Sequence, residues 1–296
     1  MPDESALGAA VRLTIAMEAA AALAAHIRVS TESLDVDDAV RSLLDEIVAE
    51  LYEGAPEVGP AAPSIVGMVR ALLRQASELV ENPARVGDWD QLDEAILQGL
   101  GRQSMTIVDA FRAATESLDG LATRLATPGA TFLDVGTGTA WLAIATARAF
   151  PQAHVTGIDI FEPALQLARG NVATENMTDR VDLKVQNATE LDERATYDAI
   201  WLPLPFMPKP VVPRAICAAA TALRPGGWLL PGTFAGPPGD RLGQLLVDLR
   251  TVRSGGHPWE SAEVVDLLAA AGLDAAHEVP RTWTAPVRLY AAQLVT

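Results

Sequence analysis

The sequence predicts an α/β protein in which an all-helical N-terminal domain precedes a doubly wound sheet. Residues 1–127 show apolar positions at helical spacing and no strand pattern. Residues 128–296 alternate between short apolar runs and helical segments, which is typical of a parallel sheet with helical crossovers. A turn with two glycines follows the first of these runs. We therefore expect two domains, residues 1–127 and residues 128–296.

The helices of the N-terminal domain follow from apolar spacing and from residues that break helices. An Ala-rich segment comes first, and the next segments place apolar side chains three or four positions apart. Residues 54–63 carry three prolines and two glycines and form a loop, and Asn82-Pro83 ends a further helix. The expected helices cover residues 5–27, 35–53, 65–81, 90–117 (with a break near Gly99) and 119–126.

The C-terminal domain alternates strands and helices along its length. The expected strands cover residues 131–135, 154–159, 181–186, 197–202, 226–231, 274–280 and 286–295. The expected helices cover residues 139–150, 162–174, 189–194, 210–223, 238–253 and 260–271. Because few residues separate the last two strands, these two strands must pair antiparallel.

Composition and charge exclude several classes of protein. Hydrophobic residues make up 49% and charged residues 20% of the 296 residues, as in globular soluble proteins. The net charge is −16 and no basic run is present, so we expect no nucleic-acid partner, because phosphate binding needs clustered Lys and Arg. The single cysteine, Cys217, excludes an internal disulfide, and its Ala-rich surroundings predict a small core residue.

The N-terminal segment predicts a cytoplasmic protein. Its first residues include Asp3 and Glu4 and lack the basic region of a secretory signal. The apolar stretch 13–25 carries Glu18 and is too short to span a bilayer, so we expect no membrane partner. The Ala-rich helix at 5–27 suits close packing against another helix, which either a homodimer or intramolecular packing would provide.

The segment Thr131–Ala140 predicts a binding site for a nucleoside cofactor. An apolar strand leads into Asp134, then into Gly136 and Gly138, and then into an Ala-rich helix. About 20 residues later a second strand ends in Asp159, whose carboxylate can accept hydrogen bonds from both hydroxyls of a ribose. Asp134 argues for a cofactor with an ammonium group, because a pyrophosphate would face the turn and helix N-terminus without needing an acid there. S-adenosylmethionine has an ammonium group and no phosphate.

At these residues the chain resembles the class I S-adenosylmethionine-dependent methyltransferase family. The family's first motif, E/D-x-G-x-G-x-G, matches Asp134–Ala140, with Ala140 in place of the last glycine. Asp159 matches the second motif, and Gln186-Asn187-Ala188 stands at the third.

The resemblance extends over residues 130–235 and includes two later motifs. Tyr197–Pro203 matches the fourth motif region, and Leu223–Gly227 matches the L-x-P-G-G turn before strand 5. The resemblance implies a Rossmann-like seven-stranded sheet whose last strand is antiparallel, with S-adenosyl-L-methionine as the cofactor. The helical residues 1–127 are similar to the variable caps of small-molecule methyltransferases.

The resemblance also implies a set of cofactor-binding residues. The expected set is Asp134, Gly136, Thr137, Gly138, Asp159, Ile160, Phe161, Asn187 and Ala188. Asn187 would accept a hydrogen bond from the adenine amino group through its side-chain oxygen. In the helix before strand 1, Arg102 or Ser104 would contact the carboxylate of the cofactor. Simpler roles stay open, with Asp159 as a helix cap and Asn187 as a turn residue.

The carboxyl ends of the strands carry an aromatic, proline-rich and nearly uncharged rim. Ligands of open parallel sheets bind beyond these ends, and such a rim suits an apolar or aromatic small molecule. The expected acceptor-pocket residues are Trp141, Pro203, Phe206, Phe234 and Trp259. Trp141 has a core role as its alternative. His257 is the candidate general base, with an ordinary loop role as its alternative.

The end of strand 4 narrows the reaction type. Its sequence, Leu202-Pro203-Leu204-Pro205-Phe206, lacks the polar first residue of the N/D-P-P-Y/F/W loop found in enzymes that methylate planar amino nitrogens. Methylation of a base or glutamine nitrogen is therefore not favoured. The strand also lacks the carboxylates of a metal-dependent O-methyltransferase, so we expect no metal.

Together these features predict methyl transfer from S-adenosylmethionine to an oxygen or carbon atom of a small aromatic or apolar metabolite, in bacterial secondary metabolism. A protein or peptide methyltransferase is one alternative, since the acidic N-terminal domain could attract a basic partner. A non-catalytic protein that keeps the cofactor-binding fold for assembly is another. A dehydrogenase is the remaining enzyme alternative.

Overall fold

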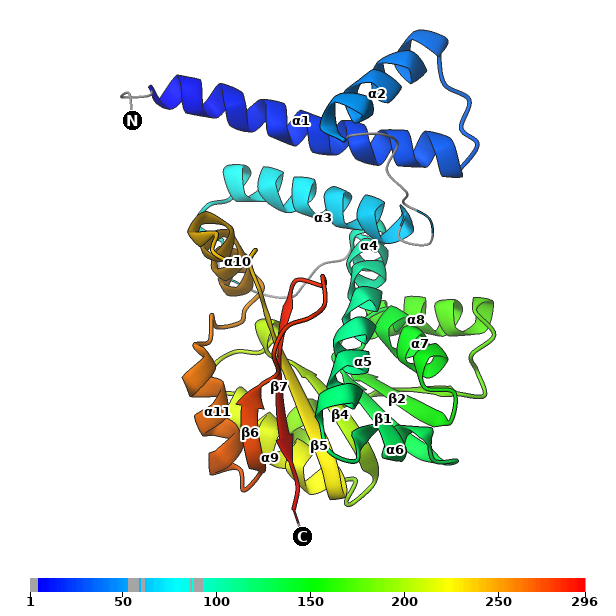
Figure 1. Cartoon of the computed structure of the whole chain (residues 1–296), viewed down its shortest axis with the longest axis vertical. Helices are drawn as coiled ribbons and strands as arrows, with labels where there is room; N and C mark the ends of the chain where they lie inside the picture. The colour runs from blue at the N-terminus through cyan, green and yellow to red at the C-terminus, as the bar shows by residue number, and fades with distance from the viewer. Residues whose placement is uncertain (1–4, 53–58, 60–61, 86, 88–92, 296) are drawn as a thin grey trace. The chain divides into compact units, whose positions relative to one another are not determined.

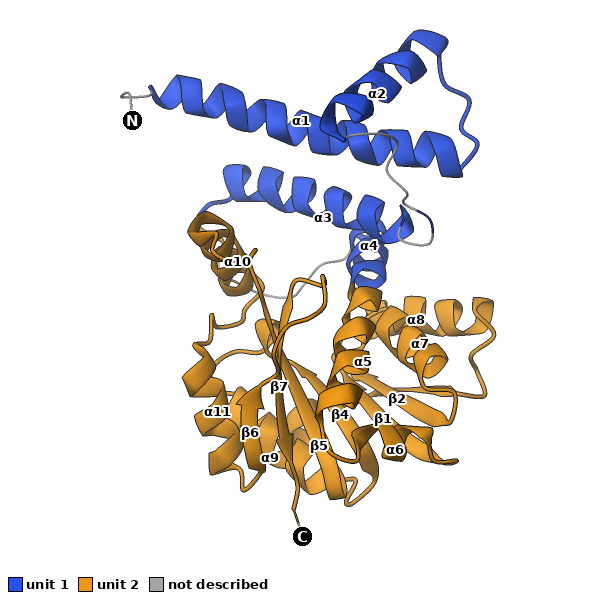
Figure 2. Ribbon diagram, viewed as in Figure 1, with its two compact units in different colours: residues 1–83, 93–103 blue, residues 84–92, 104–296 orange. Residues whose placement is uncertain are grey.

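The computed structural model describes residues 5–52, 59, 62–85, 87 and 93–295. The chain divides into two compact units, which Figures 1 and 2 show. The helical unit comprises residues 1–83 and 93–103, and the sheet unit comprises residues 84–92 and 104–296.

The sheet unit is built on seven strands in the order β3-β2-β1-β4-β5-β7-β6. The strands are β1 (Ala130–Val135), β2 (Ala153–Asp159), β3 (Val181–Val185), β4 (Tyr197–Pro203), β5 (Leu223–Phe234), β6 (Asp274–Glu278) and β7 (Val287–Gln293). β1 to β5 pair in parallel, and β7 is antiparallel to both β5 and β6. The predicted fold class, including its reversed last strand, is confirmed.

Helices cover both faces of this sheet. They are α5 (Val108–Ser117), α6 (Leu121–Ala126), α7 (Trp141–Ala149), α8 (Glu162–Thr174), α9 (Val212–Ala222), α10 (Arg241–Arg253) and α11 (Ser261–Ala270). Two apolar clusters form the core, one against α5 to α8 and the other against α9 and α11. Successive residues alternate between them, so Phe132 belongs to the first and Leu133 to the second. This double burial explains the nearly continuous apolar runs of the strands.

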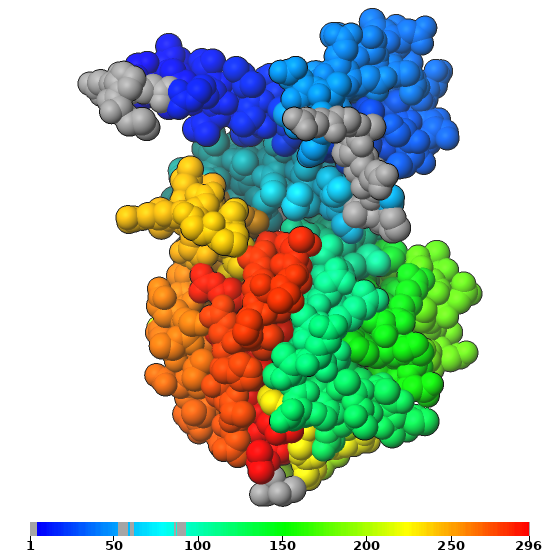
Figure 3. All heavy atoms as spheres, viewed as in Figure 1, coloured from blue at the N-terminus to red at the C-terminus, as the bar shows by residue number. Residues whose placement is uncertain are grey.

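The boundary between the units lies at residues 103 and 104, upstream of the expected boundary at 127 and 128. α5 and α6 are helical as predicted, but they pack into the core of the sheet unit. The ring of Phe111 lies 5.3 Å from the rings of both Phe132 and Trp201. Figure 3 shows the α5–α6 segment (green) beside the segment of β7 (red). Periodicity identifies a helix, but it does not say which core the apolar face joins.

The helical unit contains α1 (Ala6–Thr31), α2 (Asp38–Leu51), α3 (Ala62–Glu81) and α4 (Glu94–Ser104), the last of which ends at the boundary. The second half of α1 packs on the first half of α3, where Ile27 and Val66 share a small core. The first half of α1 leaves Leu7, Val11 and Ile15 exposed. The helix α1 is longer than the apolar stretch 13–25, and by length and composition it could cross a membrane. Core helices of soluble proteins and signal sequences meet the same criteria of length and composition.

The prediction that Cys217 is a core residue is wrong, because its side chain is exposed. The buried face of α9 includes Ala215, Ile216 and Ala219. Position 217 follows Ile216 by about 100° around the helix, which turns it away from that face. An apolar helix that covers a sheet still has one outward side.

Candidate functional site

The turn between β1 and α7 forms an open backbone surface. Gly136 and Gly138 have φ values of +66° and +53°, in the region that favours glycine. A Cβ atom at Gly138 would meet no other atom within 4 Å, so the space above it is free. The N–H of Thr137 donates to the carbonyl oxygen of Ile158, which ties the turn to the end of β2. Ala140, at the motif's last glycine position, also has a positive φ of +64°.

Asp134 is a buried carboxylate directly beneath this turn. Its side chain is 1% exposed, and one oxygen accepts a 2.7 Å hydrogen bond from the hydroxyl of Thr137. Burial raises the pKa of Asp134 to about 7, and the charge of Asp159 adds to this shift. A cation at this position would stabilise the ionised carboxylate, which fits an ammonium group.

Asp159 connects the turn to the start of α8. Its Oδ2 accepts from the N–H of Gly138 at 2.8 Å, and its Oδ1 accepts from the N–H of Phe161 at 2.9 Å. Burial raises the pKa of this carboxyl as well. Each oxygen keeps a second lone pair, so the carboxylate can bind backbone and also accept from the two hydroxyls of a ribose. The cap role and the cofactor role are therefore compatible.

The residues after Asp159 provide an apolar surface. The side chain of Ile160 is 71% exposed, although it follows directly on a buried strand. Phe161 is half-buried and stands at the N-terminus of α8. An exposed isoleucine beside a diol-binding carboxylate suits contact with the face of a purine.

Asn187 acts as the cap of a short 3-10 helix, η3 (Ala188–Glu190). Its Oδ1 accepts from both the backbone N–H and the hydroxyl of Thr189, at 2.9 and 3.0 Å. Both lone pairs of this oxygen are in use, so an adenine amino group would have to displace Thr189. Within the described residues the Nδ2 group of Asn187 has no hydrogen-bond partner, and it can donate. Ala188 is buried beside it.

Arg102 and Ser104 fall on the two sides of the boundary between the units. Arg102 lines a cavity of the helical unit, together with Arg70 and Gln98. Ser104 is the last residue of α4 and the first of this part of the sheet unit. Their contact with the carboxylate of the cofactor stays a prediction.

Part of the predicted acceptor pocket comes together at the ends of β4 and β5. The rings of Phe206 and Phe234 pack edge to face with centroids 5.5 Å apart. Pro203, the last residue of β4, lies next to the glycine turn, since a Cβ atom at Gly136 would be 3.3 Å from its Cγ. These two contacts place an apolar rim beside the cofactor turn.

The two predicted pocket tryptophans are buried, one in each core cluster. Trp141 begins α7 and is 8% exposed, as its core alternative requires. Trp259 is 7% exposed, and its Nε1 is buried without a hydrogen-bond partner among the described residues. Their part in acceptor binding stays a prediction.

His257 lies in a network of charged residues. Its Nε2 is 3.0 Å from the Nζ of Lys209, which also contacts Glu263 at 3.3 Å and lies over the ring of Trp259. An ammonium donates its protons, so the Nε2 lone pair that a general base would use is engaged. Lys209 was not among the predicted site residues, although it is one of only two lysines in the chain.

The loop that carries His257 packs tightly against the end of β4. A Cβ atom at Gly256 would clash with the carbonyl oxygen of Pro205, so only glycine permits this approach. The loop is thus fixed against η4 (Leu204–Phe206). Among the described residues, no group of three or more His, Cys, Asp or Glu could hold a metal ion.

Comparison with known proteins supports a methyltransferase domain. Residues 132–227 match a methyltransferase domain family. A release factor glutamine methyltransferase of Rhodopirellula baltica is 35% identical over 94 residues, which are 31% of this chain and 32% of that protein. A ubiquinone biosynthesis O-methyltransferase of Xanthomonas campestris pv. campestris is 36% identical over 121 residues, 40% and 48% of the two chains. The chain thus spans between about a third and a half of the length of these two curated relatives.

Solved structures share the fold over the whole chain. An O-methyltransferase family protein from Burkholderia thailandensis has a TM-score of 0.67 at 16% identity and covers 99% of both chains. Human N-acetylserotonin methyltransferase, solved with S-adenosylmethionine, has a TM-score of 0.67 at 15% identity and covers 100% of both chains. At these identities the likeness concerns the fold. The domain match shows that the chain carries a methyltransferase domain, and its motif order is that of the class I S-adenosylmethionine-dependent family that it resembles.

Proposed function

We propose that this protein transfers a methyl group from S-adenosyl-L-methionine to an oxygen or carbon atom of a small aromatic or apolar metabolite. The observation that carries the proposal is a buried carboxylate, Asp134, and a partly buried one, Asp159, beside an open glycine turn. Burying a carboxylate without a neighbouring cation lowers stability, so a chain that places two of them together favours a cationic ligand with hydroxyl donors.

S-adenosylmethionine, when bound, supplies a methyl group on a positively charged sulfur. The chain's own part is to bind and orient. Asp134 would balance the ammonium group, Asp159 would accept from the ribose hydroxyls, and Ile160 would contact the adenine. The turn from Gly136 to Gly138 would let the backbone approach the ligand closely.

The proposed class of methyl acceptor rests on the apolar side chains near Pro203, at the ends of β4 and β5. Phe206 and Phe234 offer aromatic edges and faces and no charge. A pocket of this kind binds flat apolar molecules and aligns their nucleophilic atom, which by itself lowers the barrier of a displacement reaction. The names of the O-methyltransferase relative and structures agree with this choice. A biosynthetic role in bacterial secondary metabolism is part of the proposal.

Deprotonation of the acceptor by His257 requires that its bond to Lys209 be broken. Two variants separate the roles. If His257 is the base, H257A abolishes turnover and K209A retains it. If the pair only fixes the loop, both variants lower turnover by a similar factor.

The direct test is calorimetric titration with S-adenosylhomocysteine, followed by a metabolite screen for mass gains of one methyl group. The proposal predicts binding at one site per chain and a methylated small molecule. Binding without any methylated product would favour the non-catalytic alternative. Failure to bind this compound would contradict the proposal.

The alternative of a protein or peptide acceptor has one observation in its favour. A matched relative is named a release factor glutamine methyltransferase, and its match to this chain covers 94 residues. Incubating the protein with labelled cofactor and a cell extract would decide, because label in protein rather than in small molecules supports this alternative.

We also propose that the protein is a cytoplasmic homodimer formed through α1. Leu7, Val11 and Ile15 recur every four residues along one side of this helix, and each is more than half exposed. In a symmetric dimer, these side chains of one copy would pack against the same side chains of the other copy, so that both are buried. Sedimentation should give a dimer for the native chain and a monomer for V11E/I15E. Flotation of the native chain with lipid vesicles would instead assign the stripe to a membrane.

A further inference from the structure

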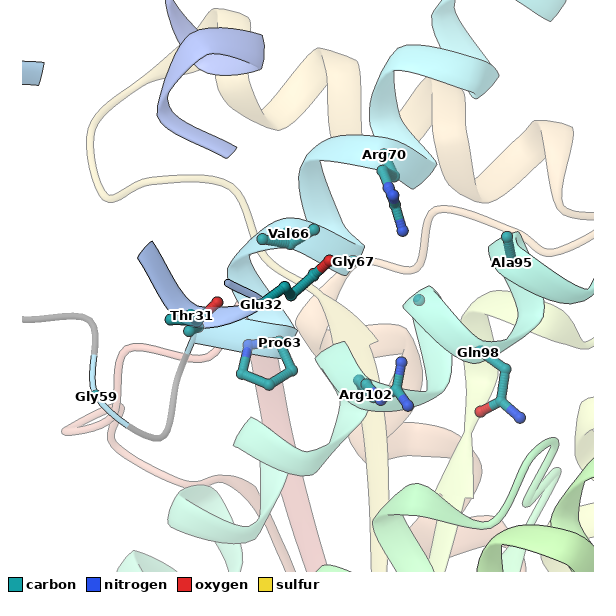
Figure 4. Close-up of a pocket in the computed structure, with 12 residues that line it drawn as sticks. Thr31, Glu32, Gly59, Pro63, Val66, Gly67, Arg70, Ala95, Gln98 and Arg102 are labelled. Carbon is teal, nitrogen blue, oxygen red and sulfur yellow. The ribbon is translucent and has the colours of Figure 1, made fainter. Parts of the chain in front are cut away.

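The helical unit has a cavity of its own, which Figure 4 shows. Its volume is about 540 Å³, within the range of small-molecule sites. The lining comes from the end of α1, the first half of α3 and most of α4. The apolar residues of this lining include Ala62, Pro63, Val66 and Ala95. All of these residues belong to the helical unit.

Two arginines extend into this cavity from different helices. Arg70 comes from α3 and Arg102 from α4, and Gln98 lies one turn from Arg102. The helical unit has only 6 Lys and Arg residues against 16 Asp and Glu residues, by count over its sequence. Two of its six cations therefore line one cavity in a strongly acidic unit.

One carboxylate, Glu32, also lines the cavity, and it is paired with Arg28. Glu32 accepts three hydrogen bonds from Arg28, two from Nε at 3.0 Å and one from a terminal nitrogen at 2.7 Å. The pKa of Glu32 lies below its usual range, chiefly because of Arg28, with a smaller contribution from Arg70. Glu32 is therefore committed chiefly to Arg28 and is not the main partner of Arg70.

The frame of the cavity is fixed by a close contact between α3 and α4. A Cβ atom at Gly67 would lie 2.9 Å from the Cα of Gly99, so the helices meet backbone to backbone. The hydroxyl of Ser64 donates to the carbonyl oxygen of Arg102 at 3.0 Å. These contacts hold Arg70 and Arg102 on one preformed surface.

We propose that this cavity binds a small organic carboxylate, whose charged group lies between Arg70 and Arg102 and whose apolar body lies against Pro63 and Val66. Arginine binds carboxylates through its fork of N–H donors, and Gln98 adds a neutral donor. The site lies in the helical unit, so it is distinct from the cofactor-binding turn of the sheet unit.

The test titrates the full chain, saturated with S-adenosylhomocysteine, with benzoate and with benzamide. The two probes share shape and differ in charge. We expect benzoate to bind with a dissociation constant of about 1 mM or better and benzamide to bind about tenfold more weakly or not at all. Equal affinity for the two probes, or no binding of benzoate, would overturn the proposal.

Variants locate the binding. R70A should weaken benzoate binding about tenfold, and R70K should restore part of it. R74A is the matched control, because Arg74 lies on the same helix and pairs with Asp93 outside the cavity. F206A tests the rim of the sheet unit and should leave benzoate affinity unchanged. The proposal fails if R74A or F206A reduces affinity as much as R70A, or if inorganic phosphate binds and benzoate does not.

Discussion

The sheet unit and the helical unit place their apolar and charged residues in opposite ways. In the sheet unit the strands are covered on both faces, and of the two carboxylates at the cofactor turn Asp134 is buried and Asp159 partly buried. In the helical unit large apolar side chains of α1 and α2 remain exposed, among them Leu13 and Leu43. The sheet unit thus encloses its apolar residues, whereas the helical unit leaves apolar surface exposed on α1 and α2.

The charges in the two units point to ligands of opposite sign. Asp134 and Asp159 suit a cation with hydroxyl groups, and Arg70 and Arg102 suit a carboxylate. The chain as a whole is acidic, so the arginine pair is the exception in its unit. Each charge pair can be tested separately.

The largest expected effect concerns stability without cofactor. The pKa of Asp134 is about 7 in the folded state against 3.8 as its ordinary value, so the folded state binds more protons between these pH values. The free energy of unfolding should therefore fall as pH rises through this window, by up to about 4 kcal/mol. D134N should remove this dependence and unfold at higher urea concentration than the native chain at pH 8.

The control for D134N is a second buried carboxylate of the same sheet. Asp198 accepts from Arg224 at 2.6 Å, from Arg124 at 3.3 Å and from the N–H of Thr131. Because D198N leaves two arginines without their partner, it should destabilise by about 3 kcal/mol. If D134N also destabilises at pH 8, Asp134 is a structural residue and the contrast between the two carboxylates is lost.

The next effect concerns cofactor affinity. D159A removes the carboxylate that accepts hydrogen bonds from the N–H groups of Gly138 and Phe161. It also removes the proposed acceptor of the ribose hydroxyls. We expect affinity for S-adenosylhomocysteine to fall about 100-fold, by calorimetry. D45A, which removes the partner of His26 in the helical unit, should change this affinity little. Equal losses would mean that cofactor binding depends on the helical unit as much as on the sheet unit.

A smaller effect is expected at the acceptor rim. F206A removes the ring that packs on Phe234, and it should raise the KM for the acceptor found in the screen about tenfold. Cofactor affinity should be unchanged. L242A, at an exposed leucine of α10, serves as the control in steady-state kinetics. An unchanged acceptor KM in F206A would place the acceptor elsewhere.

The smallest effect concerns the position in the first motif where this chain departs from the family. Ala140 is held at a φ of +64°, which costs an L-residue about 1 kcal/mol. A140G should therefore raise the free energy of unfolding by up to about 1 kcal/mol. A145G, in the buried middle of α7, should lower it by about the same amount. Urea denaturation of both variants distinguishes backbone strain from loss of a methyl group.

Much of the sheet unit could be predicted because its constraints are local. Parallel strands buried on both faces read as apolar runs, and the glycine turn requires residues that tolerate positive φ. The predicted helix bounds at 162–174 agree with α8 residue for residue. The antiparallel last strand agrees with the family resemblance.

The remaining features depend on long-range packing that periodicity does not contain. α5 joins the sheet unit through Phe111, the outward side of α9 carries Cys217, and Lys209 reaches His257 across 48 residues of sequence. Asn187 was expected at the adenine, yet its oxygen is engaged by Thr189 two residues away. The arginine cavity needs α1, α3 and α4 to meet, so no single segment indicates it.

The central claim is that a cationic cofactor binds over an ionised Asp134 in the sheet unit. The most direct measurement is the affinity for S-adenosylmethionine between pH 6 and pH 8, by calorimetry. Because the pKa of Asp134 is about 7, affinity should fall about tenfold per pH unit below 7 and level off above it. An affinity that does not change over this range, or equal pH dependence in D134N, would contradict the account.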